Sequence, residues 1–207
     1  MRVIAGEKGG RRLLAPAGRA TRPTSDRVRE AAFSMLESLD VLDGAEVWDL
    51  FAGSGAIGIE ALSRGAAHAT FVEQAGPAVS ATRANLAGLG YGPERATVIY
   101  GDVLNWVRSR ASALIGARPE GEDSVNMGRG GKVRVDIVAA DPPYAWQGWS
   151  VLLGCLAPLG PVVLAETGED LALPQTWEAL RSKRYGGTVV TLARPRPNDS
   201  RMKAAGR

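Results

Sequence analysis

The chain is poor in the residues that bind metals or form disulfide bonds, because its 207 residues include one cysteine and one histidine. Cys155 has no partner for an intramolecular disulfide, and its leucine neighbours indicate a packed thiol. One cysteine and one histidine make no soft-ligand cluster, so we expect no metal. No run of eighteen apolar residues and no leader peptide is visible, so we expect a cytoplasmic protein without a membrane partner.

Net charge is also small, at +3, but the positive charges gather at the two ends of the chain. Residues 1–30 carry eight Lys or Arg against three acids, and residues 181–207 carry eight against one. The middle of the chain is therefore acidic. This segregation fits a polyanionic partner that docks on the basic ends. For the last ten residues a disordered, solvated tail is the preferred explanation.

Apolar runs alternate with helical patterns in the central part of the chain, which predicts a doubly wound α/β sheet with mostly parallel strands. Strands are expected at 46–50, 69–73, 97–100, 135–140 and 161–166, and helices at 56–64, 77–89, 103–112 and 149–156. After residue 166 this alternation of strands and helices ends. A short helix near 174–180 and a hairpin about Gly186-Gly187, with strands 183–185 and 188–193, should follow. The sheet should therefore end in an antiparallel pair.

Residues 1–40 are expected to form a basic extension made of a small β-hairpin and a helix. The segments 3–6 and 13–16 flank a turn at 8–12, and a helix start at 22–26 precedes apolar residues at helical spacing. Residues 41–195 should form the main domain and 196–207 a disordered tail. The segment 118–132, rich in glycine and charge, should be a mobile surface insertion.

The tetrapeptide Asp141-Pro142-Pro143-Tyr144 follows the predicted strand 135–140, at the sheet edge where α/β proteins bind ligands. A carboxylate, two prolines and an aromatic ring there make a rigid slot with hydrogen-bond acceptors and a stacking face. Such a slot suits a flat base with an exocyclic amine. A Pro-Pro turn capped by aspartate explains the tetrapeptide taken alone equally well, so other motifs must decide.

The run from Asp49 to Gly58 leaves the first predicted strand and opens a helix, and its glycines satisfy the pattern G-x-G-x-x-G. Glu73 follows at the end of the second strand, where a ribose-binding acid belongs. A nicotinamide dehydrogenase shares these features, but Asp49 opposes a pyrophosphate and attracts an ammonium. With Asp102 after the third strand, the row of acids fits S-adenosylmethionine. For any one of these acids alone a helix N-cap is the preferred explanation, but their place at successive strand ends favours the cofactor.

This interpretation assigns a part of the cofactor to each strand end. Amides of the glycine loop would receive its carboxylate, Asp49 its ammonium, Glu73 its ribose hydroxyls and Asp102 its adenine amine. The predicted cofactor-binding residues are Asp49, Phe51, Ala52, Gly53, Ser54, Gly55, Gly58, Glu73, Gln74, Asp102 and Val103. The predicted catalytic residues are Asp141, Pro142, Pro143 and Tyr144.

The glycine loop, the acids and the tetrapeptide resemble the class I S-adenosylmethionine-dependent methyltransferases that modify exocyclic amines on a Rossmann-like sheet. The N-terminal segments 3–6, 10–13 and 21–30 are similar to those of the bacterial RsmD family, which methylates N2 of a guanine in 16S ribosomal RNA. The resemblance extends to about Ala193. It implies S-adenosylmethionine as cofactor, no metal, and a monomer that acts on 16S rRNA within the small ribosomal subunit or an assembly intermediate.

Other methyltransferases carry similar tetrapeptides, so the guanine assignment depends on the N-terminal segments. Asp-Pro-Pro-Tyr also occurs in DNA adenine-N6 methyltransferases, and Asn-Pro-Pro-Tyr in protein glutamine-N5 methyltransferases. Both remain alternatives, although a chain of this length has little room for a DNA target-recognition domain. A non-catalytic RNA-binding module would explain the basic ends but not the glycine loop or the tetrapeptide.

The guanine hypothesis predicts how the residues divide the chemistry. An aspartate with a pKa of about 3.9 cannot deprotonate a neutral amine, so Asp141 and the Pro142 carbonyl should accept the two N2 hydrogens and aim the lone pair. Tyr144 should stack on a base held out of its helix. The cations expected to hold RNA phosphates are Lys8, Arg11, Arg12, Arg22, Arg27 and Arg29. Arg22 and Arg27 have an alternative role in ion pairs with core acids.

Overall fold

The structure of the chain is a computed structural model that describes residues 1–16, 26–116 and 134–197. Arg22, the predicted insertion at 118–132 and residues 198–207 of the predicted tail lie outside these residues.

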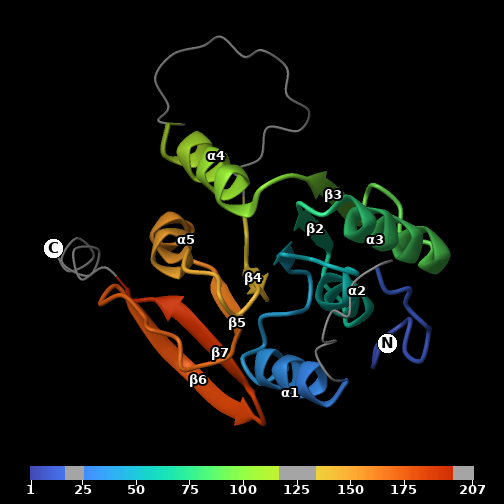
Figure 1. Cartoon of the computed structure of the whole chain (residues 1–207), viewed down its shortest axis with the longest axis horizontal. Helices are drawn as coiled ribbons and strands as arrows, with labels where there is room; N and C mark the ends of the chain where they lie inside the picture. Colours follow the sequence, from blue (N-terminus) through green and yellow to red (C-terminus); the bar gives the residue numbers. More distant parts are fainter. Residues whose placement is uncertain (17–25, 117–133, 198–207) are drawn as a thin grey trace, which may run out of the picture.

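Seven strands form one mixed sheet in the order β3-β2-β1-β4-β5-β7-β6 (Figure 1). The first five strands are parallel, and β6 and β7 form an antiparallel hairpin that pairs with β5 through β7. The strands are β1 (Glu46–Leu50), β2 (His68–Glu73), β3 (Ala96–Tyr100), β4 (Ile137–Ala140), β5 (Val162–Thr167), β6 (Trp177–Tyr185) and β7 (Thr188–Pro195). The predicted doubly wound sheet with an antiparallel end is confirmed.

Helices cover both faces of this sheet. They are α1 (Asp26–Glu37), α2 (Ala56–Ser63), α3 (Gly76–Leu89), α4 (Val103–Gly116) and α5 (Trp149–Leu156), followed by the 3-10 turn η1 (Ala157–Leu159). Side chains alternate along a strand, so Val47 of β1 packs with the layer that contains α1, α2 and α3, whereas Trp48 packs with α4 and α5. We call the first layer the α1 side of the sheet.

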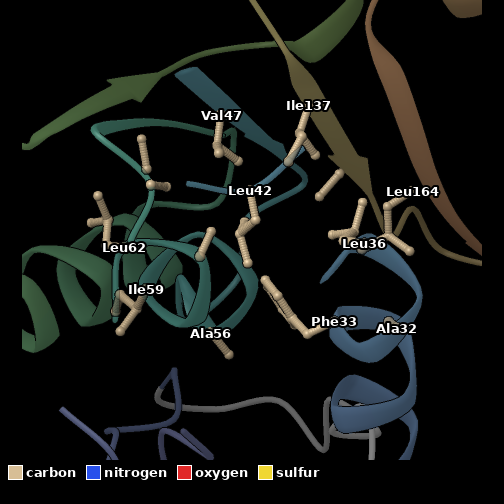
Figure 2. Packing of buried hydrophobic residues seen from close by; sticks show 14 of the residues in the cluster. Ala32, Phe33, Leu36, Leu42, Val47, Ala56, Ile59, Leu62, Ile137 and Leu164 are labelled. Atoms are coloured by element: carbon tan, nitrogen blue, oxygen red, sulfur yellow. The ribbon is translucent and has the colours of Figure 1, made fainter. Parts of the chain in front are cut away.

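Apolar side chains of α1 fill the space between this helix, α2 and the sheet. Figure 2 shows Phe33 and Leu36 of α1 facing Leu42, Ile137 and residues of α2. Phe33 and Leu36 are each only 1% exposed, so burial of this face holds α1 on the domain. The helix predicted from the apolar spacing after residue 26 is confirmed, and it shares its core with the main domain.

The helix predicted near residues 174–180 is wrong. Residues 177–185 are the edge strand β6, which pairs with β7 from Trp177 opposite Pro195 to Tyr185 opposite Thr188. Trp177 is 2% exposed in the core on the α4 and α5 side. Its burial and the ladder of strand hydrogen bonds outweigh the helical preference of the Glu-Ala-Leu segment that follows it.

The N-terminal hairpin docks on α2 through one buried carboxylate. Glu60, which is 0% exposed, accepts hydrogen bonds from the amides of Ile4 at 2.7 Å and Ala5 at 3.0 Å. The same carboxylate is 2.7 Å from Arg64 and 3.8 Å from Arg29, both with nearly buried side chains. Because a buried charge must be paired, Glu60 fixes the hairpin, α1 and α2 against one another.

Candidate active site

The loops after β1 and β4 lie side by side at the point where the strand order reverses. Leu50 is paired with Ala140 across the two strands, so Phe51 and Asp141 begin neighbouring loops. Open α/β sheets bind ligands at such a reversal, outside the carboxyl ends of the strands. We call residues 49–58, 73–75 and 102–103 the cofactor half of the site, and residues 141–149, 166–168 and 188 the base half.

Asp49 is the buried acid of the cofactor half, at 2% exposure. The Gly58 amide donates a hydrogen bond of 2.8 Å to its Oδ2. Burial raises the pKa of the Asp49 carboxyl from 3.8 to about 8, the Gly58 amide lowers it, and the nearby carboxylates of Asp141 and Glu73 raise it. The structure therefore brings Asp141 and Glu73 within electrostatic reach of Asp49, and a bound cation would relieve their repulsion with it.

The glycines of the loop have two different tasks. Gly53 and Gly55 have φ values of 58° and 77°, and Phe51, which has a side chain, has 62°. A Cβ on Gly55 or Gly58 would lie 2.9 Å from Thr82 or 2.4 Å from Phe71, so these two glycines permit close packing. A Cβ on Gly53 would meet only the Phe51 carbonyl oxygen, at 3.9 Å. The space beside Gly53 is therefore open to a ligand, while its amide is held by Glu73 and its carbonyl by Thr82.

Glu73 ties the end of β2 to the glycine loop. Its two carboxylate oxygens accept hydrogen bonds from the amides of Gly53 at 3.0 Å and Ala75 at 2.7 Å. These bonds hold the carboxylate in a fixed orientation, and each oxygen has a second lone pair for a hydroxyl. Gln74 beside it is exposed.

Asp102 stands apart from the buried acids. It is exposed, and its Oδ1 accepts a hydrogen bond of 2.8 Å from the Asn105 amide, three residues on. Asp102 therefore caps α4, as the alternative interpretation of a single acid predicted. Val103, the first residue of α4, is buried. The second oxygen of Asp102 has no part in the Asn105 bond.

Contacts from two segments hold the tetrapeptide in the base half. The hydroxyl of Tyr144 lies 2.7 Å from that of Thr188, at the start of β7. A Cβ on Gly168 would lie 3.0 Å from the Tyr144 ring, so the ring rests directly on that glycine. Tyr144 nevertheless stays 49% exposed, while Asp141 is half-buried and Pro142 buried. A ring held at its edge and by its hydroxyl, and half exposed, is suited to stacking.

An aromatic row joins the two halves of the site. The ring centroids of Phe51 and Trp146 are 4.9 Å apart, and those of Trp146 and Trp149 are 5.5 Å apart, both edge to face. The row explains the strained backbone of Phe51, because this side chain anchors the loop after β1 to the loop after β4.

Sequence patterns missed three residues that support the site. Asn85 of α3 joins the extension to the glycine loop: its Nδ2 donates to the Ser54 carbonyl at 2.9 Å, and its Oδ1 accepts from the Leu14 amide at 2.7 Å. Thr188 holds Tyr144. Glu166, which is buried, follows Ala165, the partner of Ala140 in β4, so it lies beside Asp141 at the sheet edge. The sequence did contain a signal for Glu166, because this acid ends the strand predicted at 161–166.

The predicted RNA-binding cations occupy different places. Arg11, Arg12 and Arg27 are exposed, and Lys8 is half-buried beside Tyr91. Arg29 corrects the prediction: it is 1% exposed, pairs with Asp26 at 3.2 Å and Glu60 at 3.8 Å, and donates to the Arg2 carbonyl. A buried guanidinium does not reach a phosphate, so Arg29 is a structural residue. It has the ion-pairing role expected of Arg22 and Arg27.

The described residues contain no group of three or more His, Cys, Asp or Glu placed to hold a metal ion. Among the same residues, no helix combines the length and apolar character needed to cross a membrane.

Known proteins share this architecture along almost the whole chain. A family model described as conserved hypothetical protein 95 matches residues 1–115. YlbH of Bacillus subtilis is 34% identical over 204 residues, which cover 95% of this chain and all of the relative. Ribosomal RNA small subunit methyltransferase D of Haemophilus influenzae is 32% identical, with 90% of this chain and 89% of the relative covered. The solved structure of the methyltransferase yhhF from Escherichia coli is 28% identical, with a TM-score of 0.73, and 96% and 99% of the two chains are covered.

The sheet order and the site define a class I methyltransferase, the class that uses S-adenosylmethionine as methyl donor. More narrowly, the chain belongs to the RsmD/YlbH family. The predicted family, fold and cofactor are therefore confirmed.

Proposed function

We propose that the protein transfers a methyl group from S-adenosylmethionine to the exocyclic N2 amine of a guanine in 16S ribosomal RNA. One observation carries the proposal: Asp141 of the tetrapeptide lies close enough to the buried Asp49 to raise its pKa. The acid for the target amine and the acid for the cofactor ammonium thus face one site. The name of the Haemophilus influenzae relative, ribosomal RNA small subunit methyltransferase D, supplies the substrate class.

The cofactor half has donors and acceptors that fit the cofactor. Asp49, buried and with a raised pKa, matches an ammonium that would stabilise its charged form. The open space beside Gly53 admits the carboxylate end, and Glu73, which accepts from the Gly53 amide, has remaining lone pairs for the ribose hydroxyls. Asp102 lies at the rim, where its second oxygen suits the adenine amine. When bound, S-adenosylmethionine supplies a methyl group on a positively charged sulfur.

The base half fits an amine that is a poor nucleophile. The guanine N2 lone pair is delocalised into the ring, and no described residue of the base half is a base strong enough to remove an N2 proton first. Asp141 and the Pro142 carbonyl instead accept the two N2 hydrogens, which localises the lone pair and directs it at the methyl group. Asp141 takes up the proton after the nitrogen has become cationic. Tyr144 holds the plane of the base.

The position of the basic hairpin favours a large RNA over a short peptide. The Lys8 amide donates to Ser63 at the end of α2, and Arg11 donates to the Gly88 carbonyl near the end of α3. Both helices start near the strand ends that form the site, and their eight and fourteen residues span about 12 and 21 Å. A partner that touches these cations while one base occupies the site must extend over that distance.

Methyl transfer with labelled cofactor tests the proposal. The protein would be incubated with radiolabelled S-adenosylmethionine and small ribosomal subunits from cells that lack its gene, and the RNA digested to nucleosides. We expect N2-methylguanosine from one site, formed at a rate lower by about a hundredfold or more with Asp141→Ala as catalyst. Label in adenine, in DNA or in protein glutamine would overturn the substrate and support one of the alternative methyltransferases, because the fold and cofactor are common to all.

A further inference from the structure

The β6–β7 hairpin carries a second group of cations to which the proposed function gives no role. Residues 181–197 contain five Lys or Arg and no acid. Arg184 is ion-paired with Asp170 at 3.3 Å, and Arg194 with Glu178 at 2.7 Å. Arg181 and Lys183 are exposed, and neither has an ion-pair partner among the described residues. Their charges are therefore not neutralised by this part of the chain.

Strand register places these two cations on the α1 side of the sheet. Lys183 pairs with Val190 and Arg181 with Leu192, both members of the core cluster that contains α1. Alternation along β6 puts Tyr185 on the same face, and the Lys183 ammonium lies 5.4 Å from the centre of its ring. Arg181, Lys183 and Tyr185 form a row of two cations and one aromatic ring, which we call the hairpin row.

The hairpin row leads directly to the base half of the site. Tyr185 is paired with Thr188 across the turn, and the Thr188 hydroxyl lies 2.7 Å from that of Tyr144. In Figure 1 the hairpin projects from the end of the sheet that lies beyond β5 and beside α1. A nucleic-acid strand that leaves Tyr144 on this side would pass over Tyr185 and then the two cations.

We propose that the hairpin row is a second RNA contact, which holds the nucleotides that flank the target base. This inference rests on the proposed function. Lysine and arginine neutralise phosphates, and the half-buried ring of Tyr185, which packs on the core, positions Lys183 beside the base half. Charges on an edge strand also prevent pairing with other chains. The two roles differ in what they predict for RNA binding and for self-association.

The test compares two double variants with the same loss of charge. Arg181→Gln with Lys183→Gln removes the cations of the row, while Arg108→Gln with Arg110→Gln removes two exposed cations of α4, on the opposite face. Binding to a 16S rRNA transcript would be measured over a range of salt concentrations. We expect the slope of log affinity against log salt to become shallower by about two for the hairpin variant and to stay unchanged for the α4 variant.

Several outcomes distinguish this inference from the proposed function. If the two double variants show the same slope of log affinity against log salt, while the wild-type protein binds and methylates RNA, only the hairpin contact is overturned. Wild-type protein that neither binds nor labels RNA overturns the proposed function and the inference together. Self-association of the hairpin variant in size-exclusion chromatography, with an unchanged slope, assigns the cations to edge protection and also overturns the contact. If the double variant does not fold, Lys183→Gln alone should reduce the slope by about one.

Discussion

In the cofactor half of the site, the acids bond to backbone amides at most 20 residues away in the chain: Asp49 accepts from Gly58, and Glu73 from Gly53 and Ala75. In the base half, the contacts join segments that are distant along the chain. Tyr144 meets Thr188, which is 44 residues on, and rests on Gly168. Apart from Asp102 and Val103, the cofactor half is thus formed by the unit β1-α2-β2, whereas the base half exists only after β4, β5 and β7 have assembled.

This difference suggests that the two halves can be disabled separately. A change in the cofactor half should act on cofactor affinity or on the stability of the βαβ unit. A change in the base half should act on turnover and leave the cofactor affinity nearly unaltered. A variant that lowered both by similar factors would show that the halves are coupled through the aromatic row.

The largest effect on turnover is expected from Asp141→Ala, which removes the acceptor for the target amine. Turnover should fall by a hundredfold or more, about 2.7 kcal/mol of transition-state stabilisation, because one such group typically contributes this much. Cofactor affinity, measured by calorimetry, should change by less than about threefold. The surface variant Glu94→Ala is the control for loss of one acid. Full turnover in Asp141→Ala would remove this residue from the mechanism.

Gly58→Ala should instead damage the cofactor half. The new methyl group would lie 2.4 Å from the Phe71 ring and 3.1 Å from the Asp49 Cβ, in a buried position. We expect thermal unfolding to show a loss of about 1 to 3 kcal/mol, together with weaker cofactor binding as the Gly58 to Asp49 bond is disturbed.

Gly154→Ala is the matched control, because this helical glycine of α5 has open space around it. It should stabilise the protein by up to about 1 kcal/mol, through the lower conformational entropy of the unfolded chain. If Gly58→Ala were as stable as this control, the close packing of α2 on Phe71 would not explain why residue 58 is a glycine.

Features that depend on residues close in the chain were predicted from the sequence, and features that depend on distant residues were not. The glycine loop, Asp49 and Glu73 span 25 residues, and local pattern is enough to place them on strand ends. The first part of the edge strand β6, up to residue 180, was predicted as a helix, because its pairing with β7 cannot be seen in its own residues. Arg29 was placed on the surface for a similar reason. Its partner Glu60 lies 31 residues on, and only packing of α1 on α2 buries the pair.

Thr188 shows most clearly what local pattern leaves out. A threonine at the start of a strand is common, and nothing near it in the chain indicates a contact with the tetrapeptide. The strand order β4-β5-β7 brings the two together, and this order was predicted only as an antiparallel end of the sheet.

The raised pKa of Asp49 predicts that cofactor binding depends on pH. Between about pH 4 and pH 8 the folded chain holds a proton on Asp49 that the unfolded chain has released, so this group's contribution to stability falls as the pH rises. Binding of an ammonium requires the charged carboxylate. Cofactor affinity should therefore fall about five- to sixfold from pH 8 to pH 7, and the number of protons released on binding should rise from about a half to nearly one.

Calorimetry in two buffers of different ionisation enthalpy measures both the affinity and the released proton. In Asp49→Asn the affinity should be lower and nearly constant over this range of pH. A wild-type affinity that does not change between pH 7 and pH 8 would mean that Asp49 is already charged, and that the ammonium is held elsewhere.

The smallest expected effect comes from the contact that positions Tyr144. Tyr144→Phe and Thr188→Val each remove one side of a single hydrogen bond, worth about 1 kcal/mol, so turnover should fall about fivefold. The double variant should be no worse than either single variant, because both remove the same bond. Tyr144→Leu, which also removes the stacking ring, should raise the KM for RNA further. If Thr188→Val lowered stability but not turnover, the hydrogen bond would join two parts of the fold without orienting the Tyr144 ring. The ring would then be positioned by its neighbours in the chain, much as the acids of the cofactor half are.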